Sequence, residues 1–142
     1  MLVALLEDAD SRADRMLALL TESFLDLEVV RFVNARTMIE WLPSNLGGVS
    51  VLCLDHDLVA QVLGDGSFVD AGTGRDVVDA LVTLAPKRPV LVHSANGLAV
   101  AGMLTVLESA GWQAASVEPF NGLEWIDSTW LPVVSQMLEM AV

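Results

Sequence analysis

Short apolar runs that alternate with helical patterns are the feature of this sequence that most constrains its fold. The run Leu2–Leu6 is uninterrupted and too short for a helix of its own, which is typical of a strand buried on both faces. Four more runs have the same character, and helical patterns separate them. The predicted strands are Leu2–Leu6, 27–33, 49–54, 89–92 and 112–117, and the predicted helices lie near 13–20, 36–42, 76–85, 98–110 and after residue 120.

This alternation of strands and helices indicates βαβ units, and therefore a five-stranded parallel sheet with helices on both faces. At 142 residues the chain has the size of one domain, which we assign to residues 1–142. For five strands the common doubly wound order is 2-1-3-4-5, with the ligand crevice between strands 1 and 3 at their carboxyl ends. We also expect Pro43 to close the second helix and residues 59–74 to form a long loop rich in Gly and Asp.

Composition and charge exclude several classes of protein. Apolar residues make up 54% of the chain and charged residues 18%, which excludes a disordered or low-complexity chain. The net charge of −12 repels nucleic-acid backbones, so we expect no extended nucleic-acid surface. Because Cys53 is the single cysteine, no internal disulfide is possible.

Residues 89–107 carry no formal charge and have about the length of a membrane span. Their middle, however, contains His93, Ser94, Asn96 and Gly97, which are costly in lipid or break helices. A strand, a polar turn and a helix explain the segment better, so we expect no membrane association. The first residues lack the basic region of a signal peptide, and we therefore expect a cytoplasmic protein.

Acidic residues gather where the predicted strands end. Glu7 and Asp8 follow strand 1, and Asp55 and Asp57 follow strand 3. Adjacent strands lie about 4.8 Å apart, so Asp8 and Asp55 are close enough to share one cation. No lysine or arginine occurs in these segments to relieve the repulsion, which favours a divalent metal, Mg²⁺ or Mn²⁺, held by Asp8 and Asp55 with Asp57 or Glu7 assisting. The alternative is that these acids cap the helices that follow.

Both histidines of the chain also fall at ends of central strands, His56 after strand 3 and His93 after strand 4. Imidazoles titrate near neutral pH, so the two are candidates for general base and acid. Ser94 and Asn96 precede a helix, whose start is a ready anion site, and are candidates for binding phosphate. Structural histidines and simple helix caps are the alternatives.

These motifs resemble those of the receiver domains of two-component response regulators, and the resemblance covers nearly the whole chain. The resembling motifs are Glu7-Asp8 after strand 1, Asp55 at the position of the phosphorylated aspartate, Ser94-Ala95 after strand 4 and Glu118-Pro119-Phe120 after strand 5. The resemblance implies a receiver-like, flavodoxin-like fold. Glu118 stands where receivers carry a lysine that pairs with the phosphoryl group, so ordinary phosphorylation at Asp55 is not expected.

A divergent branch, the cyclic-phosphate processing receiver domains, is more similar still. Leu54-Asp55-His56-Asp57-Leu58 resembles the Leu-Asp-His-Asp-Leu-Gly motif of that family, with Val59 in place of the glycine. His93-Ser94-Ala95-Asn96 resembles its His-Ser-x-Asn motif. The resemblance implies a small cyclic phosphate as ligand.

Two functions follow from these observations. The first is metal-dependent hydrolysis of a cyclic phosphate, in which the carboxylates hold the metal, His56 and His93 supply base and acid, and Ser94 and Asn96 bind phosphate oxygens. The second is a non-enzymatic, receiver-derived module for signalling or protein interaction.

The last segment suggests a homodimer, because it carries more apolar side chains than one helix face needs. Those side chains are Ile126, Trp130, Val133, Val134, Met137 and Leu138.

Overall fold

A five-stranded parallel sheet in the order β2-β1-β3-β6-β7 forms the centre of the molecule, as described by a computed structural model of residues 1–141. The strands are β1 (Leu2–Leu6), β2 (Glu28–Phe32), β3 (Val51–Asp55), β6 (Val90–His93) and β7 (Ala114–Val117). The helices are α1 (Asp10–Ser23), α2 (Ala35–Asn45), α3 (Gly74–Leu81), α4 (Gly97–Ser109) and α5 (Leu131–Met140), with a 3₁₀ turn at Leu46–Gly48 and a π-helical turn at Ile126–Trp130. This arrangement confirms the predicted order of strands.

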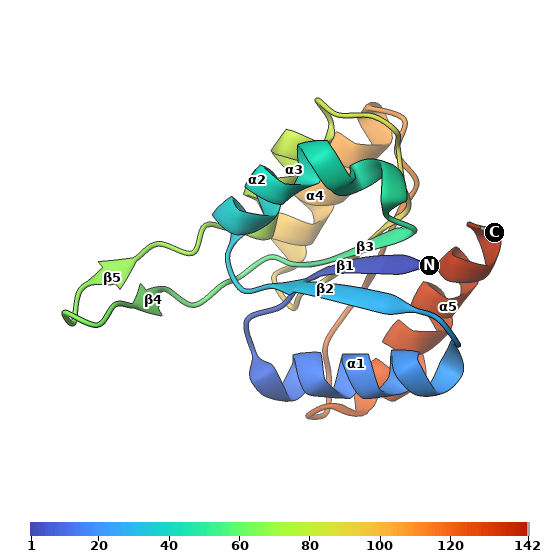
Figure 1. Ribbon diagram of the computed structural model, residues 1–142, viewed down its shortest axis with the longest axis horizontal. Helices are drawn as coiled ribbons and strands as arrows, with labels where there is room; N and C mark the ends of the chain where they lie inside the picture. The colour runs from blue at the N-terminus through green and yellow to red at the C-terminus, as the bar shows by residue number, and fades with distance from the viewer. Residues whose placement is uncertain (142) are drawn as a thin grey trace.

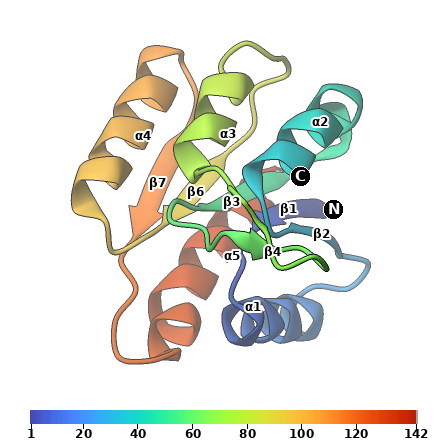
Figure 2. The ribbon, with the colours of Figure 1, turned by 90° about the vertical axis from the view of Figure 1, so that its left-hand side faces the viewer.

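The helices form two layers, one on each face of the sheet (Figures 1 and 2). Helices α2, α3 and α4 cover one face, and α1 and α5 cover the other. Successive residues of β1 alternate between the two cores: Ala4 and Leu6 contact the first, Val3 and Leu5 the second. Both faces are therefore buried, which explains why the strands are uninterrupted apolar runs.

Helix α2 continues past Pro43 to Asn45, so the prediction that this proline closes the helix is wrong. A proline within a helix removes one N–H donor. Here Leu42 and Leu46 on either side are both buried in the core. Burial of these apolar side chains holds the last turn in place despite the missing hydrogen bond.

Residues 59–74 are not the continuous loop expected from the sequence. They contain a two-stranded antiparallel hairpin, β4 (Gln61–Val62) and β5 (Phe68–Val69), which extends away from the body of the molecule (Figure 1). Its turn contains Asp65-Gly66, and Gly66 adopts a φ of 85°, which glycine tolerates and most residues do not. We call residues 58–72 the arm.

The apolar residues of the last segment are used within the chain. Ile126, Trp130, Val134 and Leu138 are fully buried in the second core, against β1, β3 and α1. Met137 is buried as well, and Val133 is partly buried. Little of the apolar surface on which we based a homodimer is therefore exposed, and a homodimer stays a prediction without that support. Among the described residues, no helix has the length and apolar character needed to cross a membrane.

Candidate metal and phosphate site

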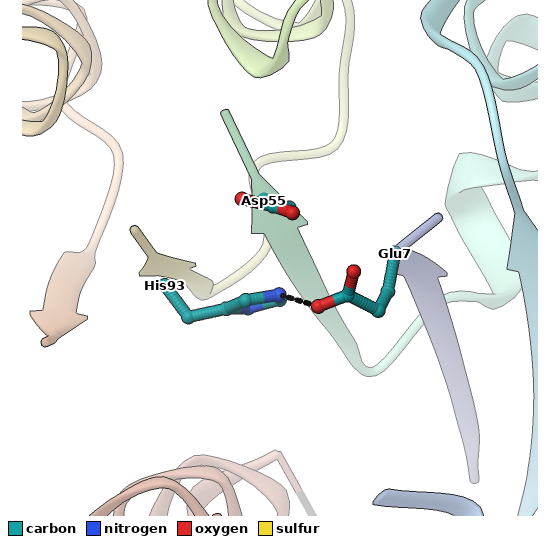
Figure 3. Close-up of side chains that lie close together, drawn as sticks. All are labelled: Glu7, Asp55 and His93. Carbon is teal, nitrogen blue, oxygen red and sulfur yellow. Dashed lines mark hydrogen bonds and ion pairs between the residues drawn. The ribbon is translucent and has the colours of Figure 1, made fainter. Parts of the chain in front are cut away.

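Three neighbouring strands bring Glu7, Asp55 and His93 together at the carboxyl edge of the sheet (Figure 3). Asp55 and His93 end β3 and β6 and are register partners, and Glu7 directly follows β1. One ligand atom from each side chain lies within 4.8 Å of the other two. All three are buried, although such side chains are rarely buried without partners.

Glu7 is held as a carboxylate by its surroundings. Its Oε1 lies 3.1 Å from His93 Nε2, and its Oε2 accepts a hydrogen bond of 3.0 Å from the Ala9 N–H. Burial raises the pKa of Glu7, but the hydrogen bond and charge of His93, the Ala9 N–H and the charge of Arg12 outweigh burial and lower the pKa to about 2. The site therefore keeps a negative charge at neutral pH.

Asp55 is shifted in the opposite direction. Burial, followed by the nearby charge of Glu7, raises the pKa of Asp55 to about 8, although the His56 N–H donates to its Oδ1 at 2.7 Å. Two carboxylates this close resist ionising together. A cation placed between them would remove that resistance and release the proton from Asp55.

Arg12 also belongs to the site, which the sequence analysis missed. Its Nη1 lies 3.7 Å from Glu7 Oε1 and 3.9 Å from Asp55 Oδ2, and its guanidinium lies 5.5 Å from the centre of the Trp125 ring. The expectation of no basic counter-charge was wrong because it considered only the strand ends. Arg12 comes from the first turn of α1, and its position four residues after Asp8 was the available signal.

A cavity of about 370 Å³ opens beside these residues. Its walls include Asp8, Asp55 and Asp57, together with Arg12 and Ser94. Both carboxylate and guanidinium groups therefore face one space, which suits a ligand that combines a cation with an anion.

Asp8 and the two predicted phosphate ligands have local hydrogen bonds. Asp8 Oδ2 accepts a 2.7 Å bond from the Val59 N–H, at the start of the arm. Ser94 is buried, and its Oγ accepts from the Asn96 N–H at 3.1 Å. Asn96 is exposed and caps α4 by accepting from the Ala99 N–H, and it does not line the cavity.

The two histidines lie in different environments. His93 is completely buried, with its ring centre 5.7 Å from that of Trp125, and among the described residues its Nδ1 has no partner. His56 Nδ1 lies 2.9 Å from Asp57 Oδ1, and Asp57 is exposed. The structure thus gathers Glu7, Asp55 and His93, and it places His56 outside that cluster.

Comparison with known families agrees with this geometry. Residues 6–109 match the model of the cyclic-phosphate processing receiver domain. The chain belongs to this family. A search of curated proteins with this sequence finds no match.

Solved structures that share the fold of this cyclic-phosphate processing receiver domain include response regulators and the receiver domain of a hybrid histidine kinase. The phosphorylated cyanobacterial phytochrome response regulator RcpA has a TM-score of 0.71 and 15% identity, with 99% of this chain and 96% of that chain covered. The receiver domain of the hybrid histidine kinase CckA has a TM-score of 0.66 and 14% identity, with coverages of 97% and 99%. The Mn²⁺-bound form of the response regulator Rcp1 has a TM-score of 0.62 and 16% identity, with coverages of 92% and 94%.

Gly74 lets α3 begin directly against Asp55. A Cβ at this position would lie 2.1 Å from the Asp55 carbonyl oxygen and 2.9 Å from Met103 Cε. Because the nearest obstacle is backbone, we expect Gly74→Ala to lower the free energy of unfolding by about 2 kcal/mol or more. The matched control is Gly97→Ala at the start of α4, where a Cβ meets nothing within 4 Å. Urea unfolding measures both variants, and equal stabilities would contradict this description of the turn.

The raised pKa of Asp55 predicts how stability depends on pH when no metal is present. The folded-state pKa of about 8 exceeds the ordinary value of 3.8, so the folded protein binds this proton more tightly than the unfolded chain. Stability therefore falls as the pH rises from about 4 to about 8, by at most about 1.4 kcal/mol per pH unit. The lowered pKa of Glu7 affects the free energy of unfolding only between pH 4.5 and about pH 2. In that range stability falls as the pH falls.

Asp55→Asn isolates this contribution, because asparagine keeps the shape of the protonated acid. We expect the free energy of unfolding of Asp55→Asn, minus that of the wild-type protein, to grow steadily between pH 5 and pH 8. Urea unfolding with a chelator present measures both proteins. A difference that stays constant over this range would show that Asp55 ionises normally in the folded protein.

Proposed function

We propose that this domain binds a divalent cation at Glu7, Asp8 and Asp55 and uses it to hydrolyse a small cyclic phosphate. The observation that carries the proposal is the clustering of Glu7, Asp55 and His93 within 4.8 Å, beside a cavity that Asp55 lines together with Asp8 and Arg12. The family description supports the substrate class. The similar fold of Rcp1, which has a Mn²⁺-bound form, supports binding of a divalent cation.

The residues present fit a cation. Two carboxylates compete for one proton here, and Asp8 adds a third at the cavity wall. Carboxylate oxygens suit Mg²⁺ and Mn²⁺. When bound, such an ion polarises a phosphate oxygen and lowers the pKa of a bound water.

Arg12 and Ser94 are the groups that we assign to the phosphate. Arg12 lines the cavity with a guanidinium that is partly exposed, and its planar donors match phosphate oxygens. Glu118 stands where receiver domains carry a lysine, so Arg12 supplies the positive charge that the lysine would otherwise provide. Ser94 lines the same cavity and can donate its hydroxyl hydrogen to the phosphate. Asn96 contributes by fixing the start of α4.

His56 is the general base in this proposal. Asp57 accepts from its Nδ1–H, which leaves Nε2 as the basic nitrogen, in the manner of other carboxylate–histidine pairs. His56 removes a proton from the attacking water, whose oxygen bonds to phosphorus. The bond from phosphorus to one ring oxygen then breaks, and that oxygen takes up the proton through solvent.

We assign His93 a role other than the general acid predicted from the sequence. Because it is completely buried and its Nε2 faces Glu7, we assign it as a positioning residue that orients this carboxylate. Its effect on the reaction therefore passes through Glu7.

Phosphorus-31 NMR tests the proposal with nucleoside 2′,3′-cyclic phosphates and small cyclic phosphates, each with Mg²⁺ or Mn²⁺. We expect conversion to phosphomonoesters by the wild-type protein and by Asp79→Asn, a control in an exposed ion pair with Arg75. Asp55→Asn should be inactive. No conversion in any combination would overturn the enzymatic proposal.

The second candidate is a non-enzymatic interaction module, which the exposed apolar side chains of the arm favour. For such a module, signalling by phosphorylation at Asp55 is a less favoured form than simple protein binding. The raised pKa of Asp55 keeps its carboxyl group protonated and a poor nucleophile at neutral pH, and Glu118 would repel the phosphoryl group. Acetyl phosphate labelling of the wild-type protein distinguishes this form from simple protein binding.

A further inference from the structure

The arm exposes more apolar surface than a hairpin in water needs. Phe68 is 72% exposed and Val62 is 64% exposed, and Leu63 and Val69 are also exposed. A two-stranded hairpin is marginally stable by itself and needs a further element packed against it. Much of the arm extends from the body without such an element (Figure 1).

Apolar side chains occupy both faces of the hairpin. Val62 pairs with Phe68, and Gln61 pairs with Val69, so each pair shares one face. The Gln61 side chain accepts a hydrogen bond from Asn34 Nδ2 at the start of α2, which turns its face toward that helix. The Val62–Phe68 face is the one left to solvent.

A groove continues from the Gln61–Val69 face toward the body of the molecule. Between the arm and α2 lies a cavity of about 290 Å³, whose walls include Leu63, Val69 and Thr37. A second cavity of about 480 Å³ shares Arg36, Glu40 and Asp70 with the first and adds Ile39 and Ala71 to the wall. A chain segment that contacts the arm can therefore place apolar side chains in both spaces.

The charge of this region selects the kind of occupant. Residues 57–74 carry Asp57, Asp65 and Asp70 and no lysine or arginine. The wall of the groove includes Arg36, but Arg36 is ion-paired with Glu40, and Asp70 and Asp76 leave the wall negative. The whole chain has a net charge of −12, so two arms brought together would repel each other. A partner that carries positive charge beside apolar groups would be attracted to the same surface.

We propose that the arm and the groove beside α2 bind an apolar segment of another protein that is flanked by lysine or arginine. The segment passes over the hairpin, so that the Val62–Phe68 pair on one face and the groove on the other bury its apolar side chains. Asp65 and Asp70 attract its basic side chains. The groove shares no lining residue with the cavity that we assign to the cyclic phosphate, although Val59 at the start of the arm lines that cavity.

Selection from a displayed library of random twelve-residue peptides tests this proposal on the wild-type protein. We expect the enriched peptides to combine apolar residues with lysine or arginine. The double variant Val62→Ser/Phe68→Ser should bind them at least tenfold more weakly by fluorescence anisotropy. The matched control Leu25→Ser/Leu98→Ser also removes two exposed apolar side chains, at 88% and 90% exposure, and should bind within twofold of wild type. Binding should weaken at high salt and with Asp65→Lys/Asp70→Lys.

Amide chemical shifts of the wild-type protein give a measurement independent of the variants, and we expect changes within residues 34–40 and 61–70. Three results would overturn the proposal. They are enrichment of no basic apolar peptide, equal losses in the arm and control variants, and shift changes confined to the site of Asp55. A wild-type dimer in sedimentation that the arm variant separates would instead identify a second copy as the occupant.

Discussion

Millimolar Mn²⁺ or Mg²⁺ is expected to raise the Tm of the wild-type protein by about 5–10 °C. A ligand at 100 times its Kd stabilises the folded state by about 2.7 kcal/mol, and this produces such a shift in a domain of this size. The physical source is the crowding of Glu7 and Asp55, in which one carboxyl group stays protonated until a cation replaces the proton. The same reasoning makes the shift larger at pH 8 than at pH 6, because metal and proton compete for Asp55.

Asp55→Asn should abolish this shift, because the amide cannot supply a charged ligand. Differential scanning calorimetry with and without metal measures it, and Asp79→Asn serves as the control with one fewer exposed carboxylate. An unchanged Tm in the wild-type protein, or an equal shift in Asp55→Asn, would remove the metal site from the proposed function.

His56→Ala is expected to lower kcat about 10²–10⁴-fold while leaving the metal-induced Tm shift in place. This is the range that general acid–base groups contribute, and His56 lies outside the Glu7, Asp55 and His93 cluster. Asp57→Asn should give a smaller loss, because it removes the acceptor that orients the His56 ring. Steady-state kinetics with a cyclic phosphate measures both variants.

His93→Ala provides the contrast. It leaves the buried Glu7 carboxylate without its imidazole partner and opens a space in the core, so we expect a lower Tm without metal as well as lower activity. If His56→Ala and His93→Ala had the same effects on activity, Tm and metal binding, the separate roles assigned here would be wrong.

The sequence predicted the sheet well because strand burial on both faces has a clear signature. Each apolar run became a strand, and the register of β3 and β6 places Asp55 beside His93. That much follows from local pattern and the common order of doubly wound sheets. The close approach of Glu7 to these two residues was less evident, because the side chain after β1 can turn to either side of the strand.

Contacts that depend on neighbouring elements were not predictable from local pattern. Arg12 reaches the site from α1, and a search limited to strand ends overlooked it. Helix α2 continues through Pro43 because tertiary burial of Leu46 offsets a missing hydrogen bond. The hairpin had a signal in Asp65-Gly66 between short apolar runs, which the glycine-rich composition of its surroundings obscured.

Trp125 gives the site an intrinsic optical reporter. Its indole is completely buried, and the Arg12 guanidinium lies 5.5 Å and the His93 ring 5.7 Å from its ring centre. Indole emission responds to nearby charge, so a ligand that moves the guanidinium or changes the charge on the imidazole alters fluorescence without any added label. Subtracting the spectrum of Trp125→Phe separates this signal from that of the other three tryptophans, and binding at the sheet edge can then be followed in real time.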